Sequence, residues 1–133
     1  MPEMKRVRDE RGAASIEMVV LLPALFAVVF LGMQAALYYH ARTIAIAAAQ
    51  EGARAAAAQH ATSGAGVAAA RSYLADVGGD ALESSSATAR RTPTTAVVTV
   101  RGQALSVIPG WAPTVRQQAR AEVERATAPG DAR

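Results

Sequence analysis

The chain has 133 residues, enough for one membrane segment and one small folded domain but not for a second hydrophobic core. Its apolar fraction is 51%, yet much of this is alanine and only 5% of residues are aromatic, so a soluble domain built from it must have a shallow core. Cysteine is absent, which excludes disulfides and thiolate metal sites, and the net charge of +3 comes from scattered basic residues without interleaved aromatics, which argues against a nucleic-acid partner.

The first segment, residues 1–12, is short, polar and mixed in charge. It is too small to fold alone, and we expect it to be disordered or loosely helical. Its basic residues are Lys5, Arg6, Arg8 and Arg11. They outnumber the basic residues Arg42 and Arg54 in the comparable stretch after the apolar run that follows. The positive-inside bias therefore predicts a cytoplasmic amino terminus and an extracytoplasmic carboxyl-terminal part.

An uncharged apolar run extends from Met18 to Tyr39. Roughly 22 helical residues at about 1.5 Å each cover the roughly 30 Å of bilayer hydrocarbon, which predicts a transmembrane helix over about 18–39. Pro23 lies inside it and predicts a kink, which a membrane helix tolerates. A secretory signal peptide is the alternative, but its apolar region would be shorter and a small-x-small cleavage site would follow.

Alanine-rich sequence without proline continues the helix beyond the membrane, so one helix is expected over 13–61. Its solvated face is indicated by a polar stripe at Thr43, Gln50 and Arg54 and by the i,i+3 pair of Glu51 with Arg54. The same helix carries small residues that would let another helix approach closely, namely Ala48, Gly52 and Ala55. That second helix could belong to the chain's own domain or to a neighbouring subunit, and the sequence leaves both open.

A small domain is expected over 62–125. Thr62, Ser63 and Gly64 break the long helix and supply N-cap chemistry for a second one, which Gly78 and Gly79 end. The apolar stripe of this second helix consists of Val67, Ala70, Tyr73, Leu74 and Val77.

Three segments after the second helix have strand character. Residues 95–101 are β-branched, and residues 82–90 are a weaker candidate to pair with them across a turn at 91–94. Residues 114–124 alternate apolar and polar side chains, which favours a strand although the composition favours a helix. Between the last two segments, Trp111 lies in an apolar loop and either closes the core or meets the membrane interface or a partner. The tail, 126–133, should be disordered.

The residues before the apolar run form a recognisable pattern. Arg11 is followed by Gly12, Ala13, two small residues, an isoleucine and Glu17. This resembles the processing site of type IV prepilin-like proteins, which have a short basic leader, a glycine before the cut and a glutamate at the fifth mature position. Cleavage between Gly12 and Ala13 would place Glu17 there. The family usually has Phe or Tyr after the glutamate, where this chain has Met18.

The resemblance extends over residues 11–54. The apolar run from Val19 through Pro23 to Leu25, followed by the stretch from Ala49 to Arg54, is similar to the TadE-like family of minor pilins, or pseudopilins, of tight-adherence (Flp-type) pilus systems. This resemblance implies an assembly protein and not an enzyme. A prepilin peptidase would mature this protein, and a pilus assembly platform would insert it among other pilin subunits. It implies a single-pass protein of the cytoplasmic membrane that enters a pilus.

The fold that we expect is α+β and pilin-like: a long amino-terminal transmembrane helix, a short helix and a small antiparallel sheet of two or three strands. The resemblance also gives Glu17 a role, because its carboxylate could pair with the ammonium that cleavage creates on Ala13 of a neighbouring subunit, inside a bundle that excludes water.

The sequence contains no catalytic, cofactor or metal motif. His40 and His60 are far apart, and no acidic cluster has metal-ligand spacing. We therefore expect the lipid bilayer and other proteins as partners, without a cofactor, a nucleic acid or a small-molecule substrate. Two alternatives stay open: an unprocessed single-span anchor that displays a small extracellular domain, and a secreted binding module.

Overall fold

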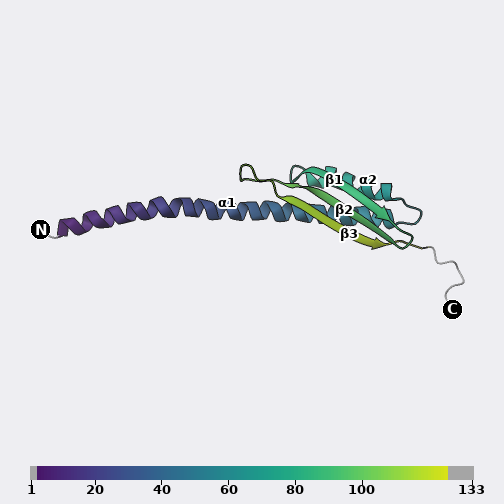
Figure 1. Cartoon of the computed structure of the whole chain (residues 1–133), viewed down its shortest axis with the longest axis horizontal. Coiled ribbons are helices and arrows are strands. Elements are labelled where there is room, and N and C mark those ends of the chain that lie inside the picture. The colour runs from purple at the N-terminus through teal and green to yellow at the C-terminus, as the bar shows by residue number, and fades with distance from the viewer. Residues whose placement is uncertain (1–2, 126–133) are drawn as a thin grey trace, which may run out of the picture.

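A computed structural model of the chain describes residues 3–125, with side chains described from Arg11 onward, so the tail expected over 126–133 lies outside the described residues. Helix α1 (Glu3–Ala57) is one continuous helix of 55 residues (Figure 1). It includes residues 3–12 of the expected leader, because a single glycine at Gly12 weakens a helix without ending it. It ends close to the position expected, where the turn after Ala57 leads into the second helix.

Helix α2 (Ser63–Tyr73) begins at the expected cap, where the hydroxyl of Thr62 accepts a hydrogen bond from the amide of Ala65 at 3.2 Å. Its last turn is a π-helix over Leu74–Gly78. The wider π turn places Gly78 in the buried position after Leu74. The prediction that Val77 faces the core is therefore wrong, and its side chain is 53% exposed.

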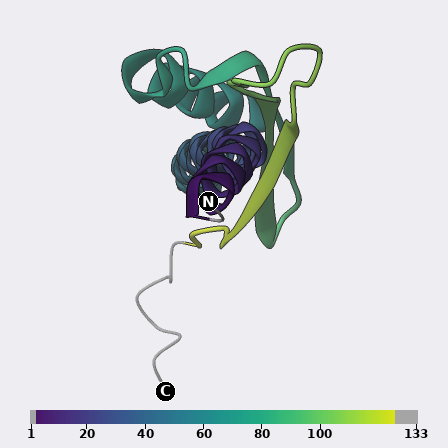
Figure 2. The ribbon, with the colours of Figure 1, turned by 90° about the vertical axis from the view of Figure 1, so that its left-hand side faces the viewer.

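Three strands follow, β1 (Leu82–Arg91), β2 (Thr95–Ala104) and β3 (Thr114–Glu122). They form one antiparallel sheet in the order β1-β2-β3. Both helices cover the same face of this sheet, with α1 and α2 side by side (Figure 2). The α+β fold and the strand over the 114–124 segment are confirmed. The alternation of apolar and polar side chains predicted this strand correctly, although the composition favours a helix, because every second side chain of a strand faces the same side of the sheet.

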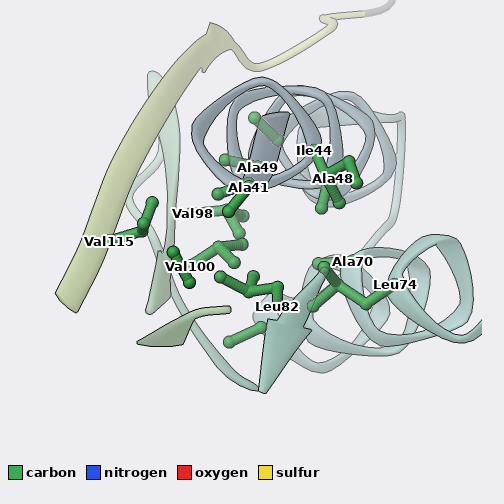
Figure 3. Packing of buried hydrophobic residues seen from close by; sticks show 14 residues of the cluster. Ala41, Ile44, Ala48, Ala49, Ala70, Leu74, Leu82, Val98, Val100 and Val115 are labelled. Atoms are coloured by element: carbon green, nitrogen blue, oxygen red, sulfur yellow. The ribbon is translucent and has the colours of Figure 1, made fainter. Parts of the chain in front are cut away.

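The core is as shallow as the composition predicts. Alanines of α1 form much of the core: Ala41 and Ala49 lie beside Val98 of β2, Ala48 faces α2, and the largest fully buried side chains are only valines (Figure 3). These are Val98, Val100 and Val115. Small side chains allow the helix backbone to approach the strands closely, so dense packing is reached without bulk.

The two helices cross at glycines. A Cβ atom added at Gly52 would lie 2.8 Å from the carbonyl oxygen of Gly66, and one added at Gly66 would lie 2.7 Å from the Cβ of Ala56. Ala48 is fully buried in the same core. The sequence left open whether the small residues of α1 contact the chain's own domain or a neighbouring subunit. At Gly52 and Ala48 they contact the chain's own domain.

The end of the domain far from the amino terminus is closed by hydrogen bonds between elements. The guanidinium of Arg91 donates to the carbonyl of Ala61 in the turn between the helices. The amide of Glu124 donates to the carbonyl of Ala57 at 2.9 Å. The distal part of α1 thus packs against α2 and the sheet, and the segment after β3 contacts its last residue.

Candidate functional site

The amino-terminal part of α1 is unlike the rest, because its large apolar side chains face outward. They are Ile16, Met18, Val19, Val20, Leu21, Leu22, Leu25, Phe26, Val28, Val29, Phe30, Leu31 and Met33. This stretch is long and apolar enough to cross a membrane, and none of its most apolar 18-residue window is buried. An unburied apolar helix of this length is consistent with a single-pass membrane anchor. Pro23 lies within the unbroken helix, and the kink expected there stays a prediction.

The expected cleavage site lies just before this apolar surface. Gly12 and Ala13 are exposed on α1, and a Cβ atom added at Gly12 would meet nothing within 4 Å. A peptidase binds its substrate as extended chain, so the helix must unwind locally for cleavage. Glycine within a helix costs about 0.5–1 kcal/mol relative to alanine, which makes this turn easier to unwind. No packing contact opposes unwinding at Gly12.

Glu17 lies one helical turn after Ala13 and is also exposed. The side chains three and four residues away along the helix carry no charge, so no helical neighbour can pair with it. Those neighbours are Ala13, Ala14, Val20 and Leu21. Among the side chains described, the one ion pair is Glu51 with Arg54, at 3.7 Å on the solvated face of α1. Glu17 thus has no ion-pair partner among the described side chains.

One polar residue inside the expected transmembrane stretch is buried by the domain. Gln34 is only 3% exposed, and its side-chain amide meets the connection between β2 and β3. Its Nε2 donates to the carbonyl of Leu105 at 3.2 Å, and its Oε1 accepts from the amide of Val107 at 2.9 Å and from the hydroxyl of Ser106 at 3.1 Å. Sequence reasoning missed this contact, although a single glutamine in an otherwise apolar run was the available signal.

Trp111 does not close the core. It lies in the same β2–β3 connection and is 50% exposed, so the first of its three expected roles is wrong. The core is instead filled by small side chains, of which the largest fully buried ones are valines. Trp111 instead stands on the surface, on the connection that contacts Gln34.

The face of the sheet away from the helices is polar and basic. Arg90 and Arg120 flank Val97 in one row across the strands, and Arg101 stands directly opposite Arg116 in another. These side chains, with threonines and Gln118 between them, line a shallow hollow. Within the described residues there is no group of three or more metal-ligating side chains.

Comparison with known proteins supports the resemblance noted in the sequence. Residues 12–54, about a third of the chain, match a family model described as TadE-like protein. Comparisons with curated proteins and with solved structures found no match. The matched segment begins at Gly12, contains Glu17 and the whole outward-facing apolar surface, and ends within the part of α1 that the domain covers. This segment is TadE-like, which relates the chain to the pilin-like structural proteins of tight-adherence pili.

Proposed function

We propose that this protein is a minor pilin or pseudopilin of a tight-adherence pilus, matured by a prepilin peptidase that cuts between Gly12 and Ala13. In this proposal the leader, residues 1–12, stays in the cytoplasm, α1 crosses the cytoplasmic membrane, and the domain over 62–125 faces outward. The pilus assembly platform then brings the processed chain together with other pilin subunits. The protein's role is structural, and its only covalent change is its own cleavage.

The observation that carries the proposal is the place of the TadE-like match on the helix. The match begins with the Gly12 and Glu17 motif, includes the whole outward-facing apolar stretch of α1, and continues into the part that the domain covers. A helix that only anchored a domain would need apolar residues but no glutamate at this position. A carboxylate costs about 2.5–3.5 kcal/mol at the bilayer centre on insertion scales and less at the boundary, so Glu17 needs a partner where subunit packing removes it from the water at that boundary.

We assign that partnership to the ammonium group of Ala13, which exists only after cleavage. Residues four apart on a helix lie about 5–6 Å apart between Cβ atoms, so each processed chain carries a cation and an anion one turn apart on the same face. A stagger of one turn between two neighbouring chains brings the ammonium of one level with the carboxylate of the other, so each chain can pair with the next in a row of subunits. Unprocessed chains lack the cation, and the mechanism therefore restricts assembly to mature subunits.

The experiment is to compare two single variants with the unaltered chain in the host membrane. Gly12→Leu should block cleavage, because a leucine clashes in a peptidase site that admits glycine; the amino terminus recovered from membranes would then be that of the full chain and not Ala13. Glu17→Gln should be cleaved and stay in the membrane, yet fail to crosslink to other pilin subunits. Breaking one partner of a desolvated ion pair costs about 3–5 kcal/mol, enough to empty an assembly.

Each variant has an outcome that contradicts the proposal. Normal maturation of Gly12→Leu would refute processing at this site and favour an unprocessed single-span anchor. An amino terminus beyond Tyr39 in the unaltered chain would favour a secreted binding module. Crosslinking of Glu17→Gln at the level of the unaltered chain would refute the ion-pair mechanism while leaving the pilin assignment intact. If Glu17→Gln is not cleaved, Glu17 acts in recognition by the peptidase and not in assembly.

A further inference from the structure

We propose that the β2–β3 connection, residues 105–113, is a second membrane contact: it lies in the headgroup layer of the leaflet from which α1 emerges, with Arg101 and Arg116 directed at lipid phosphates. This surface is called the interfacial loop below. The inference requires that α1 crosses the membrane, and it is independent of leader processing and of pilus assembly.

The depth of the interfacial loop follows from its contact with α1. Seventeen residues separate Glu17 from Gln34, about 26 Å at a rise of about 1.5 Å per residue. The bilayer hydrocarbon is about 30 Å thick, so a helix with Glu17 at one boundary has Gln34 close to the other. The hydrogen bonds from Gln34 fix the interfacial loop at this level. Figure 1 shows this loop reaching farther toward the amino-terminal half of α1 than the strands do.

The chemistry of the interfacial loop suits that level. It contains no charged residue, Trp111 and Pro109 are exposed, and Ile108 is half-buried. Tyr38 and Tyr39 lie on α1 just beyond Gln34, with their rings edge to face at 6.1 Å between centroids. Tryptophan and tyrosine concentrate where the bilayer meets water, because their rings are apolar and carry one polar group. The exposed rings of Tyr39 and Trp111 come from two parts of the chain and suit this layer, whereas Tyr38 packs against the core of the domain.

The backbone of the interfacial loop is prepared for a poorly hydrated site. The amide of Ile108 donates to the hydroxyl of Ser106 at 3.1 Å, and the carbonyl of Ile108 accepts from that hydroxyl and from the amide of Trp111 at 3.3 Å. The amide of Ala104 donates to the carbonyl of Pro113 at 2.9 Å and closes the loop. Unpaired backbone groups are costly near lipid, and here internal partners and Gln34 satisfy several of them.

The arginine pair lies at the base of the interfacial loop. Arg101 and Arg116 are directly opposite in the register of β2 and β3, on the outer face of the sheet, and both are exposed. Like charges directly opposite across strands are destabilising, and among the described side chains no carboxylate lies within 4 Å of either. Arg101 precedes Leu105 by four residues, about 13 Å of strand. An extended arginine side chain covers about half of this distance, and the headgroup layer, about 5–7 Å thick on each side of the bilayer, covers the rest. Phosphate groups would supply the missing anions.

The test uses Trp111, which is the only tryptophan of the chain, in the full-length protein reconstituted into phosphatidylcholine vesicles. Lipid brominated near the glycerol end of its acyl chains should quench the emission at least about two-fold, while water-soluble acrylamide should quench it weakly, because an interfacial indole meets acyl chains and not bulk water. The control is Trp111→Phe with Thr94→Trp, which moves the tryptophan to the exposed turn at the far end of the sheet. It should show the reverse pattern.

The arginines are tested in a matched pair of double variants. Arg101→Gln with Arg116→Gln should weaken quenching by the brominated lipid, whereas Arg90→Gln with Arg120→Gln, on the same face but farther from the interfacial loop, should leave it unchanged. Equal effects of the two double variants would refute the phosphate contact.

Two outcomes would overturn the membrane contact itself. Free access of acrylamide to Trp111 would place the interfacial loop in water, and protection from both quenchers would mean that protein covers Trp111. Flotation of the chain with the vesicles checks the anchor separately, so either result would leave the anchor standing.

Discussion

Replacing Gln34 with leucine should release the interfacial loop, although it makes the membrane segment more apolar. Hydropathy alone predicts a better anchor for Gln34→Leu, since leucine favours the bilayer more than glutamine does. The structure predicts the opposite for the domain. Leucine cannot replace the hydrogen bonds to the carbonyl of Leu105 and the amide of Val107, whereas the hydroxyl of Ser106 keeps its contacts with Ile108.

The magnitude follows from the two backbone groups that lose their partner. An unsatisfied buried polar group costs about 1–3 kcal/mol, so two cost about 2–6 kcal/mol if the loop stays closed. If the loop instead opens, these two groups reach water, and the destabilisation cannot exceed the free energy that holds the loop closed in the unaltered chain. We expect about 2–3 kcal/mol, which corresponds to about 30- to 150-fold less protection of the Val107 amide against hydrogen exchange.

The measurement is hydrogen exchange by mass spectrometry on the full chain in lipid nanodiscs, read in peptides that cover 105–113. Gln50→Leu is the matched control, because Gln50 is an exposed glutamine of the same helix with no contact to the loop. The core strand β2 should stay protected in both variants. Unchanged exchange of the loop in Gln34→Leu, or an equal increase in Gln50→Leu, would refute the assignment of Gln34 as the residue that holds the loop.

Two further predictions concern the helix crossing and the orientation. Gly52→Ala should destabilise the domain by about 1–3 kcal/mol, because its Cβ would lie 2.8 Å from a carbonyl oxygen of α2. Gly64→Ala should be neutral or stabilising, because its Cβ would meet only a hydroxyl at 3.6 Å. Urea unfolding of the full chain in micelles measures both free energies, and equal stability of the two variants would contradict the close helix crossing. A reporter fused after Arg133 should be active only outside the cytoplasm, because the basic residues before the span hold the leader inside, and activity of a cytoplasm-restricted reporter would overturn the topology.

The architecture was predictable because each element depends on local pattern. A long uncharged run followed by alanine-rich sequence predicts α1, and Thr62 marks the start of α2. The alternation over 114–124 identifies β3 because every second side chain of that strand faces the helices. The shallow core follows from composition, since a chain rich in alanine and poor in aromatics has no large side chains to bury.

The details that sequence reasoning missed depend on contacts between distant residues or on irregular geometry. Gln34 and Leu105 are 71 positions apart, so no local pattern links them. The exposure of Val77 depends on a π turn that shifts the helical period by one residue. Trp111 is exposed on the connection between β2 and β3, which its apolar character alone did not reveal.

The candidate site stays a prediction. Gly12 and Glu17 are exposed on α1, and Glu17 has no ion-pair partner among the described side chains. Cleavage needs a peptidase and assembly needs other subunits, so the structure of one chain gives only the positions of the residues involved. Both events stay predictions.

The division of α1 into a covered and an uncovered half restricts how subunits could pack. The small residues that would allow close approach in water, Ala48 and Gly52, already contact the chain's own domain. The free helical surface is the stretch from Ile16 to Met33, which faces either lipid or the same stretch of a neighbour. Lipid tails are as apolar as these side chains, so burial of this surface against a neighbour gives little hydrophobic driving force. In the proposed mechanism the choice between lipid and neighbour therefore depends on Glu17 and on the ammonium that cleavage creates beside it, which is why a single glutamate should decide assembly without affecting insertion.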